Sequence, residues 1–282
     1  MRDDSEKIKR HYEESKIFTT KERKELPTIN IRKFNNFIKA VLLKNHVKLN
    51  DAVLDLGCGK GGDINKYAEL GISEYVGMDI ASACIEEAKK RHKMRRTRFK
   101  ANFMVKDCFN EQFDLQKMFD VITLQFSFHY AFVNENSLSV SLSNISKHLK
   151  DGGKVIATIP NSEAILRRLK KYGNNFGNEF YSVKFVDDKI TENTLGVEYY
   201  FTLRDSIDQC IEYLIYIDLL KKECEKYDLK IVEFVDFATY FNQNVKKHLV
   251  LYNLMVNARL TTSEIAVPQL YSILVLIKEK EK

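Results

Sequence analysis

The spacing of apolar side chains before Pro160 follows two periods in alternation. Apolar residues recur at helical spacing over about 30–43, 81–91 and 138–149, and another helix is expected from about Asp63. Short apolar runs that predict buried strands lie between and after these segments: 52–56, 75–78, 99–105, 121–124 and 154–159. Strands that alternate with helices form a parallel sheet with helices on both faces. This part of the chain therefore predicts an α/β fold.

The pattern changes after Pro160. The segments 180–185 and 199–203 predict an antiparallel strand pair, inserted into the main fold at about 175–205. Two further runs, 230–235 and 271–277, predict closing strands. Between the insertion and these strands, apolar side chains predict one more helix: Ile211, Leu214, Ile215, Leu219 and Leu220.

The N-terminal segment differs from the rest in composition. Residues 1–26 are rich in charge of both signs and contain few large apolar side chains. Such a segment buries little apolar surface, so we expect a mobile or loosely docked arm. The expected division is a charged arm over 1–29 and one folded domain over 30–282.

Composition excludes several classes of protein. Hydrophobic residues make up 44% of the chain and charged residues 30%, which fits a folded protein rather than a disordered one. No run of about 18 apolar residues occurs, so we expect no membrane span. The N-terminus lacks the apolar segment of a signal peptide, so we expect an intracellular protein. The five cysteines are scattered without a C-x-x-C pair, so neither a disulfide framework nor a zinc site is expected.

The net charge of +6 is unevenly distributed. The segment 89–100 contains eight lysine or arginine residues and no acidic residue. One interpretation is a solvated helix face followed by a loop. The other is a surface for a polyanion such as RNA. Composition does not choose between them.

A glycine-rich loop follows the first predicted strand, within the segment VLDLGCGKGGD at 53–63. Glycines allow the backbone to turn sharply and to approach a ligand closely. Acidic residues flank this loop at Asp55 and Asp63, where they would repel a pyrophosphate but suit a cationic amino-acid ligand. Asp79 ends the next strand, where a carboxylate can accept both ribose hydroxyls of an adenosine. Asp107 ends the third strand, where an adenine amino group would lie.

This order of features resembles the class I S-adenosylmethionine (AdoMet)-dependent methyltransferases. The resemblance implies a Rossmann-like fold with a mostly parallel seven-stranded sheet, helices on both faces and a small antiparallel insertion. An ordinary tight turn would explain the glycines alone. A nicotinamide-dependent dehydrogenase would explain the loop, but it explains the flanking acids poorly.

Further motifs resemble the eukaryotic mRNA cap guanine-N7 methyltransferases, from about residue 30 to the C-terminus. Residues 32–39, RKFNNFIK, are similar to the R-x-F-N-N-x-x-K segment of that family, and 125–130, QFSFHY, to its Q-F-x-x-H-Y segment. The other matching segments are 160–162 (PNS), 176–179 (FGNE), 212–216 (EYLIY) and the closing Tyr271. The chain is shorter than the family pattern between Val41 and Val53 and after Tyr252.

The resemblance assigns roles to residues of this chain. The residues expected to contact AdoMet are Lys39, Asp55, Gly57, Asp79, Asp107, Gln125 and Tyr130. The residues expected to line the cap site are Asn35, Lys60, Lys66, Arg91, Phe126, His129, Tyr130, Pro160, Glu212 and Tyr271. Neither a metal nor an acid–base catalytic residue is implied, because guanine N7 already carries a free lone pair and the cofactor supplies the reactive methyl group.

The chemistry of the side chains agrees with these roles. A buried Glu212, expected on the helix after the inserted strands, could accept both donors of the guanine Watson–Crick edge. Aromatic residues such as Phe126 and Tyr271 can stack on an unpaired base. Lys60, Lys66 and Arg91 can balance a triphosphate.

Simpler explanations stand beside each role. His129 could be a core histidine with satisfied hydrogen bonds, Phe126 an ordinary strand residue, and Glu212 a solvated helix residue. A methyltransferase for a small molecule or for another RNA base would share the same fold. A protein that binds capped RNA without methylating it would share the same motifs.

The expected partner is the capped 5′ end of mRNA, with other capping enzymes or the transcribing RNA polymerase as additional candidates. The expected location is the nucleus, and the expected state is a monomer.

Overall fold

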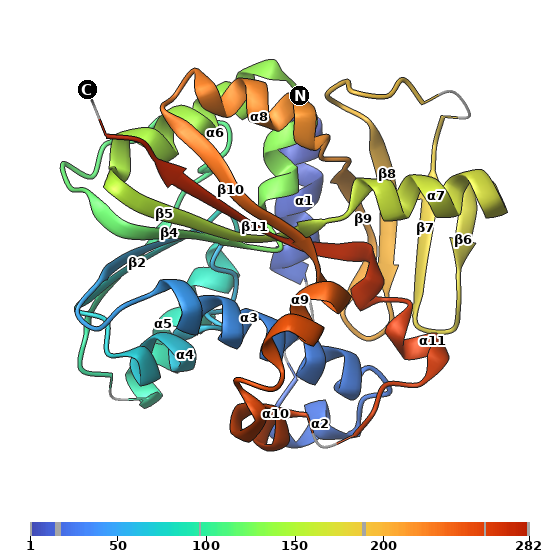
Figure 1. Cartoon of the computed structure of the whole chain (residues 1–282), viewed down its shortest axis with the longest axis horizontal. Coiled ribbons are helices and arrows are strands. Elements are labelled where there is room, and N and C mark those ends of the chain that lie inside the picture. The colour runs from blue at the N-terminus through green and yellow to red at the C-terminus, as the bar shows by residue number, and fades with distance from the viewer. Residues whose placement is uncertain (1, 15–17, 96, 188–189, 257, 281–282) are drawn as a thin grey trace.

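The computed structural model describes residues 2–14, 18–95, 97–187, 190–256 and 258–280. Its centre is a seven-stranded sheet (Figure 1). In spatial order the strands are β10 (Leu229–Asp236), β11 (Tyr271–Lys278), β5 (Leu149–Pro160), β4 (Phe119–Gln125), β1 (Ala52–Leu56), β2 (Glu74–Asp79) and β3 (Lys100–Val105). The pairs within β5-β4-β1-β2-β3 are parallel, and β11 runs antiparallel to both neighbours. The predicted mostly parallel seven-stranded sheet is confirmed.

Helices cover both faces of this sheet, as predicted. Figure 1 shows α3 (Ile29–His46), α4 (Ile64–Leu70) and α5 (Ser82–Arg95) below the sheet, and α6 (Glu135–His148) and α8 (Ile217–Glu225) above it. Because both faces are covered, all five residues of β1 are buried. The apolar stripe of α3 is buried at helical spacing: Ile31, Phe34, Phe37, Ile38, Val41, Leu42 and Leu43.

The insertion is larger than the sequence pattern predicted. The predicted pair corresponds to β7 (Tyr181–Phe185) and β8 (Glu198–Leu203), but the sheet has four strands in the order β6-β7-β8-β9. The added strands are β6 (Asn175–Gly177) and β9 (Ile207–Tyr213). Helix α7 (Ser162–Tyr172) connects the end of β5 to this second sheet.

The helix predicted over 211–220 was wrong in its first half. Strand β9 extends to Tyr213 and pairs antiparallel with β8, and α8 begins only at Ile217. A short apolar run fits a buried strand and a helix equally well, and pairing with β8 decides here. Glu212 therefore lies on a strand, opposite Tyr199, and not on a helix.

The N-terminal arm is also different from the expectation. Residues 2–14 form α1 (Arg2–Glu14), which packs on α5 and β9, and α2 (Thr20–Glu25) packs on α3. Helix α1 has few apolar residues, but Ile8 and Tyr12 are four residues apart and lie on one helix face. That face is enough to place the helix against the domain.

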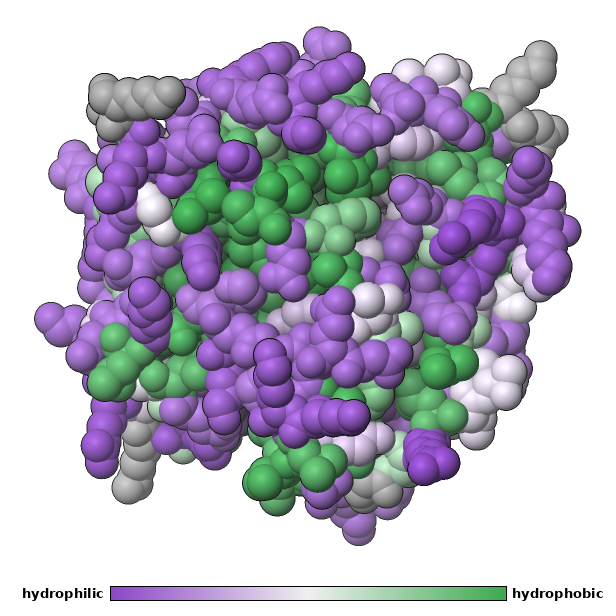
Figure 2. Space-filling model, in the orientation of Figure 1, coloured by the Kyte–Doolittle hydropathy of each residue, from purple (hydrophilic) through white to green (hydrophobic). Residues whose placement is uncertain are grey.

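The remaining helical elements lie after β4 or between β10 and β11. They are η1 (Phe128–Val133), α9 (Phe237–Asn244), α10 (Leu249–Met255), α11 (Thr262–Ile265) and η2 (Pro268–Leu270). Helix α10 has no buried residue, and Leu249, Val250 and Leu254 are exposed. They contribute to the apolar area at the lower edge in Figure 2. No helix of the described ranges is long and apolar enough to cross a membrane.

Candidate active site

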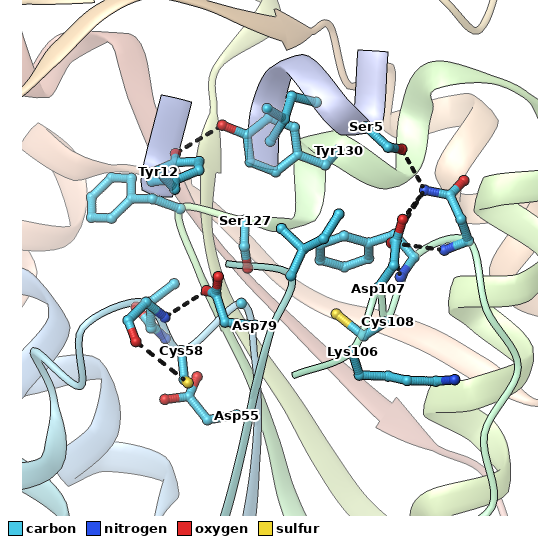
Figure 3. Close-up of a pocket in the computed structure, with 18 of the residues that line it drawn as sticks. Ser5, Tyr12, Asp55, Cys58, Asp79, Lys106, Asp107, Cys108, Ser127 and Tyr130 are labelled. Carbon is cyan, nitrogen blue, oxygen red and sulfur yellow. Dashed lines mark hydrogen bonds between the residues drawn. The ribbon is translucent and has the colours of Figure 1, made fainter. Parts of the chain in front are cut away.

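A pocket of about 250 Å³ opens at the carboxyl ends of the central strands. It lies where the strand order reverses, between β4 and β1, which is the usual ligand site of such sheets. Eight of the residues predicted for the site line this pocket: Lys39, Asp55, Gly57, Asp79, Asp107, Gln125, Phe126 and Tyr130. Figure 3 shows Asp79 and Asp107 on opposite sides of it, with Tyr130 at its upper end.

The glycine-rich loop forms the floor of the pocket because its glycines permit close packing. Gly57 has a φ of 76°, and a Cβ there would lie 2.4 Å from the Cβ of Ser127. The backbone N–H groups of Gly57 and Cys58 both donate to the carbonyl of Met78, at 2.8 and 2.9 Å. The loop therefore holds β1 and β2 together, and a larger side chain at Gly57 would displace it.

Asp79 ends β2 with its carboxylate fixed by the backbone. Its two oxygens accept hydrogen bonds from the N–H groups of Gly59, at 2.8 Å, and Ala81, at 2.9 Å. Burial raises the pKa of Asp79. Each oxygen accepts only one of these bonds, so both can still accept a hydroxyl group. This arrangement suits a ribose diol in the pocket.

Asp55 and Asp63 give the pocket a negative side. Asp55 accepts hydrogen bonds from the hydroxyls of Tyr75 and Thr123, at 2.9 and 2.8 Å. Burial, and then the nearby Asp63 carboxylate, raise the pKa of Asp55 to about 7. A cationic ligand beside these groups would lower that pKa again and would be bound favourably.

Asp63 is held between two lysines. Its carboxylate accepts from Lys39 Nζ at 2.8 Å and from Lys66 Nζ at 2.6 Å, and Lys66 also donates to Asn36. Burial alone would raise the pKa of Asp63, but the ammonium groups of Lys39 and Lys66 lower it far below its usual range. Lys66, predicted to contact the triphosphate, is thus bound to a buried carboxylate in the free protein.

Three further cofactor candidates line the pocket from other strand ends. Asp107 accepts from the backbone N–H groups of Phe109 and Asn110 and from the Asn110 side chain. Gln125 ends β4 and contacts Thr158 on β5. The Tyr130 hydroxyl forms a 2.8 Å hydrogen bond with the hydroxyl of Tyr12, which the sequence did not predict as a site residue.

A second polar group lies next to this pocket but is closed off from solvent. Glu212 and His129 are 4% and 2% exposed. Tyr199 donates to one oxygen of Glu212 at 2.7 Å, and the other oxygen lies 3.9 Å from Nε2 of His129. Among the described residues, neither ring nitrogen of His129 has a hydrogen-bond partner.

This pair is not an ion pair. Burial raises the pKa of Glu212 to about 7, and burial lowers the pKa of His129 to about 3, so the imidazole is neutral. Buried polar atoms without partners are rare in folded proteins and indicate a ligand site. His129 is therefore not a core histidine with satisfied bonds, and Glu212 is not a solvated residue.

Aromatic side chains enclose the same region. Tyr271, Pro160 and Glu212 surround a narrow gap that is too small for a water molecule, and Tyr271 pairs with Pro160 across β11 and β5. The ring of Phe126 packs edge-on against Tyr271, with centroids 4.9 Å apart. Phe126 has a φ of 60°, a backbone conformation that side chains rarely adopt. Such strain is found mainly at functional sites.

The predicted phosphate-binding residues lie apart from these pockets. Lys60 and Arg91 line neither of them, and Arg91 donates to Glu87 at 2.8 Å. Burial, and then the charge of Arg91, lower the pKa of Arg23 on α2. Burial also lowers the pKa of Lys60, and the charge of Arg91 acts in the same direction. Arg23 therefore joins the cluster, which the sequence did not predict. The oxygen of Asn35 is buried without a partner among the described residues.

Sequence reasoning also missed the contribution of α1. Asp4, Ser5, Ile8 and Tyr12 line the main pocket. Their spacing of one and four residues places them on one helix face, but that signal is weak in a segment so rich in charge. Within the described ranges, no group of three or more His, Cys, Asp or Glu side chains could hold a metal ion.

Comparison with known proteins gives concordant results. The family described as the mRNA (guanine-N(7))-methyltransferase domain matches residues 1–269. The chain is 34% identical over 278 residues to the mRNA cap guanine-N(7) methyltransferase of Candida glabrata, covering 91% of this chain and 67% of that protein. The corresponding enzymes of Saccharomyces cerevisiae and Schizosaccharomyces pombe are 35% and 36% identical, over 85% and 84% of this chain. The chain spans 60% and 69% of those two proteins.

Solved structures agree on the fold. The CcbJ methyltransferase from Streptomyces caelestis aligns with a TM-score of 0.58 and 14% identity, covering 87% of this chain and 90% of that one. An S-adenosylmethionine-dependent methyltransferase from Clostridium acetobutylicum aligns with a TM-score of 0.54 and 19% identity, covering 88% and 92%. At these identities the likeness concerns the fold alone.

Proposed function

Because this chain belongs to the mRNA (guanine-N(7))-methyltransferase family, we propose that it transfers a methyl group from AdoMet to N7 of the guanine in the 5′ cap of mRNA. One structural observation carries the assignment to guanine. A buried carboxylate, Glu212, and a buried imidazole with no hydrogen-bond partner among the described residues, His129, lie beside an aromatic wall next to the main pocket.

The main pocket fits AdoMet. Asp79 offers acceptors to a ribose diol, and Asp107 lies at the end of β3, where an adenine amino group is expected. Asp55, whose pKa is raised to about 7 by burial and then by the neighbouring Asp63 carboxylate, provides negative charge for the ammonium and sulfonium groups. Gly59 and Gly62 leave open space where the ligand would approach the backbone, since a Cβ at either would meet nothing within 4 Å.

The second region carries hydrogen-bonding groups that are complementary to one edge of guanine. One oxygen of Glu212 already accepts from Tyr199, and among the described residues the other has only His129 nearby, at 3.9 Å. Guanine presents N1–H and N2–H donors on one edge, which a single carboxylate can accept. A neutral His129 can donate to a carbonyl oxygen such as guanine O6. Adenine has neither the N1 proton nor O6, so this pair discriminates against it.

Methylation of N7 needs positioning and no proton transfer by the protein. Guanine N7 carries no proton, so no general base is required. When bound, AdoMet supplies a methyl group on a sulfonium. Holding N7 in line with that methyl group can contribute ~7–11 kcal/mol. As the new C–N bond forms and the C–S bond breaks, positive charge passes to the purine, where an ionised Glu212 stabilises it.

The basic segment of α5 and the loop after it supports a further contact with RNA. Lys89, Lys90, Lys93, Arg95, Arg98 and Lys100 are all exposed. Arg91, on the same helix, belongs to the basic cluster with Lys60 and Arg23. We assign the cluster to the cap triphosphate and the exposed residues to the phosphates of the following nucleotides. A solvated surface remains the competing explanation for the exposed residues.

The wider context of the reaction follows from the same proposal. A substrate at the 5′ end of new transcripts favours a nuclear location and contact with other capping enzymes or the transcribing RNA polymerase. The active form in this proposal is a monomer.

Transfer of tritiated methyl groups from AdoMet tests the proposal. We expect label on GpppA, GpppG and capped RNA, and none on ApppA, which lacks guanine. Hydrolysis of the product should release 7-methylguanine. A small-molecule methyltransferase or a binding protein would label none of these caps, and a methyltransferase for another RNA base would label RNA but not the dinucleotides.

A further inference from the structure

Helix α6 has a polar face that is buried, although a helix that covers a sheet normally buries apolar side chains. This polar face consists of Ser137, Ser141, Asn144 and His148, each no more than 2% exposed. Their spacing of four, three and four residues places them on one side of the helix. Buried polar groups cost stability unless they form hydrogen bonds, so their partners indicate what this face of α6 does.

All four side chains form hydrogen bonds with the loop of residues 106–118, which connects β3 to β4. Asn144 contributes most of them. Its NH₂ group donates to the carbonyls of Cys108 and Glu111, at 3.1 and 2.9 Å. Its oxygen accepts from the backbone N–H of Phe113 at 3.3 Å. One side chain of α6 therefore takes the place of the regular hydrogen bonds that this loop lacks.

His148 fixes the far end of the loop. The backbone N–H of Leu115 donates to Nε2 of His148 at 3.0 Å, so Nε2 carries no proton. Nδ1 then carries the proton and donates to the carbonyl of Asn144 at 2.7 Å. Burial lowers the pKa of His148, which favours this neutral form. Ser141 adds a longer bond to the carbonyl of Phe109, at 3.4 Å, so the loop is held along most of its length.

The same loop forms one side of the cofactor pocket. Asp107, Cys108, Phe109 and Asn110 all line it, and Figure 3 shows Asp107 and Cys108 on the same side. Asp107 is the residue expected to meet the adenine amino group. Its carboxylate accepts from the backbone N–H groups of Phe109 and Asn110, each at 3.2 Å. The conformation of the loop therefore determines where this carboxylate points.

Ser137 connects the polar face of α6 to that carboxylate. Its hydroxyl donates to Oδ1 of Asn110, and Nδ2 of Asn110 donates to Asp107 at 3.0 Å. This chain of bonds fixes the orientation of the Asn110 amide, because the reversed amide would turn its oxygen toward the carboxylate. Ser137 thus lies two hydrogen bonds away from the expected adenine contact and does not itself line the pocket.

We propose that the polar face of α6 positions the loop of residues 106–118 and thereby sets the preference of the cofactor pocket for adenine, with Ser137 and Asn144 as positioning residues. The inference rests on the proposed function, because it concerns the cofactor of the same reaction. A loop that is held in its binding conformation loses less freedom when the ligand binds. Hypoxanthine carries a carbonyl where adenine carries its amino group, so a fixed Asp107 carboxylate should reject it.

The first test compares the Kd of S-adenosylhomocysteine with that of S-inosylhomocysteine, its hypoxanthine analogue, by calorimetry. The wild-type protein should prefer the adenine form. In Ser137→Ala the Kd of S-adenosylhomocysteine should rise roughly two- to tenfold, the effect of one neutral hydrogen bond, while the Kd of the analogue changes less. The preference for adenine should therefore fall.

Ser139→Ala is the matched control for this test. Ser139 also lies on α6, and its hydroxyl forms a 2.6 Å hydrogen bond with that of Tyr227, away from the loop. The control loses a hydrogen bond of the same kind and should keep the wild-type preference. An unchanged preference in Ser137→Ala, or an equal fall in Ser139→Ala, would overturn the positioning role.

The second test uses Asn144→Ala, which removes three hydrogen bonds to the loop. The preference for adenine should fall roughly tenfold or more, and amide hydrogen exchange within residues 107–116 should become faster. A merely structural role would lower the unfolding temperature and the fraction of active protein but leave the ratio of the two Kd values unchanged. An unchanged ratio would overturn the role of Asn144, and Ser137→Ala carries the test if Asn144→Ala does not fold.

These outcomes are distinct from failure of the proposed function. A wild-type protein that binds neither ligand, or that does not methylate GpppA, would contradict the function itself. A wild-type protein that binds both ligands equally would overturn the inference, because there would be no preference to set. A wild-type protein that prefers S-adenosylhomocysteine, together with variants of equal preference, would contradict only the role of α6.

Discussion

Glu212→Gln tests guanine recognition, because it keeps the size of the side chain and removes its charge. One oxygen of Glu212 accepts from the Tyr199 hydroxyl at 2.7 Å. A glutamine would turn its carbonyl oxygen toward that hydroxyl and present its NH₂ group to the guanine. The N1–H and N2–H donors of guanine would then face the NH₂ donor of the glutamine.

The magnitude follows from the burial of the pair. Two hydrogen bonds to a charged group, at about 1.5–3 kcal/mol each, correspond to a loss of roughly 10²- to 10⁴-fold in kcat/KM. The affinity for AdoMet should not change, because Glu212 does not line the cofactor pocket. Tritiated methyl transfer to GpppA measures the first quantity, and calorimetry with AdoMet measures the second.

The same substitution should stabilise the free protein above pH 5. Burial raises the pKa of Glu212 to about 7, so the unfolded chain ionises at lower pH than the folded one. The protonated Glu212 makes its full contribution to the free energy of unfolding below its unfolded pKa of about 4.3. That contribution is lost as the pH rises through about 7. Glutamine does not titrate. Between pH 5 and pH 7 the variant should therefore gain about 2 kcal/mol relative to wild type in denaturant unfolding.

Glu264→Gln is the matched control, because Glu264 is also 4% exposed and lies in the capping box of α11, outside both pockets. It should retain methylation at the wild-type rate. If Glu212→Gln also methylates GpppA at the wild-type rate, the carboxylate does not read guanine, and the reasoning from buried polar atoms is refuted.

Other predictions address the cofactor, pH and RNA. Asp79→Ala should abolish AdoMet binding in calorimetry while the circular dichroism spectrum stays native, and an unchanged affinity would disprove the ribose assignment. KM for GpppA should rise about tenfold per pH unit below 7, because the guanine donors require ionised Glu212; a flat profile from pH 5.5 to 8 would contradict this. Lys93→Glu combined with Arg95→Glu should weaken binding of long capped RNA, and its salt dependence, more than methylation of GpppA. Equal effects on both substrates would indicate that these residues form only a solvated surface.

Features set by local sequence were predictable. Strand β1 begins and ends where the apolar run predicted, at Ala52 and Leu56, because a parallel strand covered on both faces consists mainly of apolar residues, with Asp55 as the polar exception. The acids at strand ends gather in one pocket because parallel strands end at one edge of the sheet. The wall formed by Phe126 and Tyr271 required the family resemblance, since those residues are 145 positions apart and no local period links them.

Features set by long-range packing were not predictable. The apolar run around Glu212 fits both a helix and a buried strand, and only its pairing with β8 makes it a strand. Residues 2–14 resemble a free arm by composition, and the contacts of Tyr12 and Glu13 with distant residues place them in the site. The pairing of Lys66 with Asp63 is local, because the two residues are three positions apart. The contacts of this pair with Lys39 and Asn36 follow from the packing of α3 on α4.

The carboxylates assigned to cofactor and guanine lie on different sheets. Asp79 ends β2 of the seven-stranded sheet, and Glu212 lies on β9 of the four-stranded one. The residues beside Glu212 come from the large sheet, because Pro160 ends β5 and Tyr271 begins β11. The guanine region is therefore built at the junction of the two sheets, and its geometry depends on how they are held together.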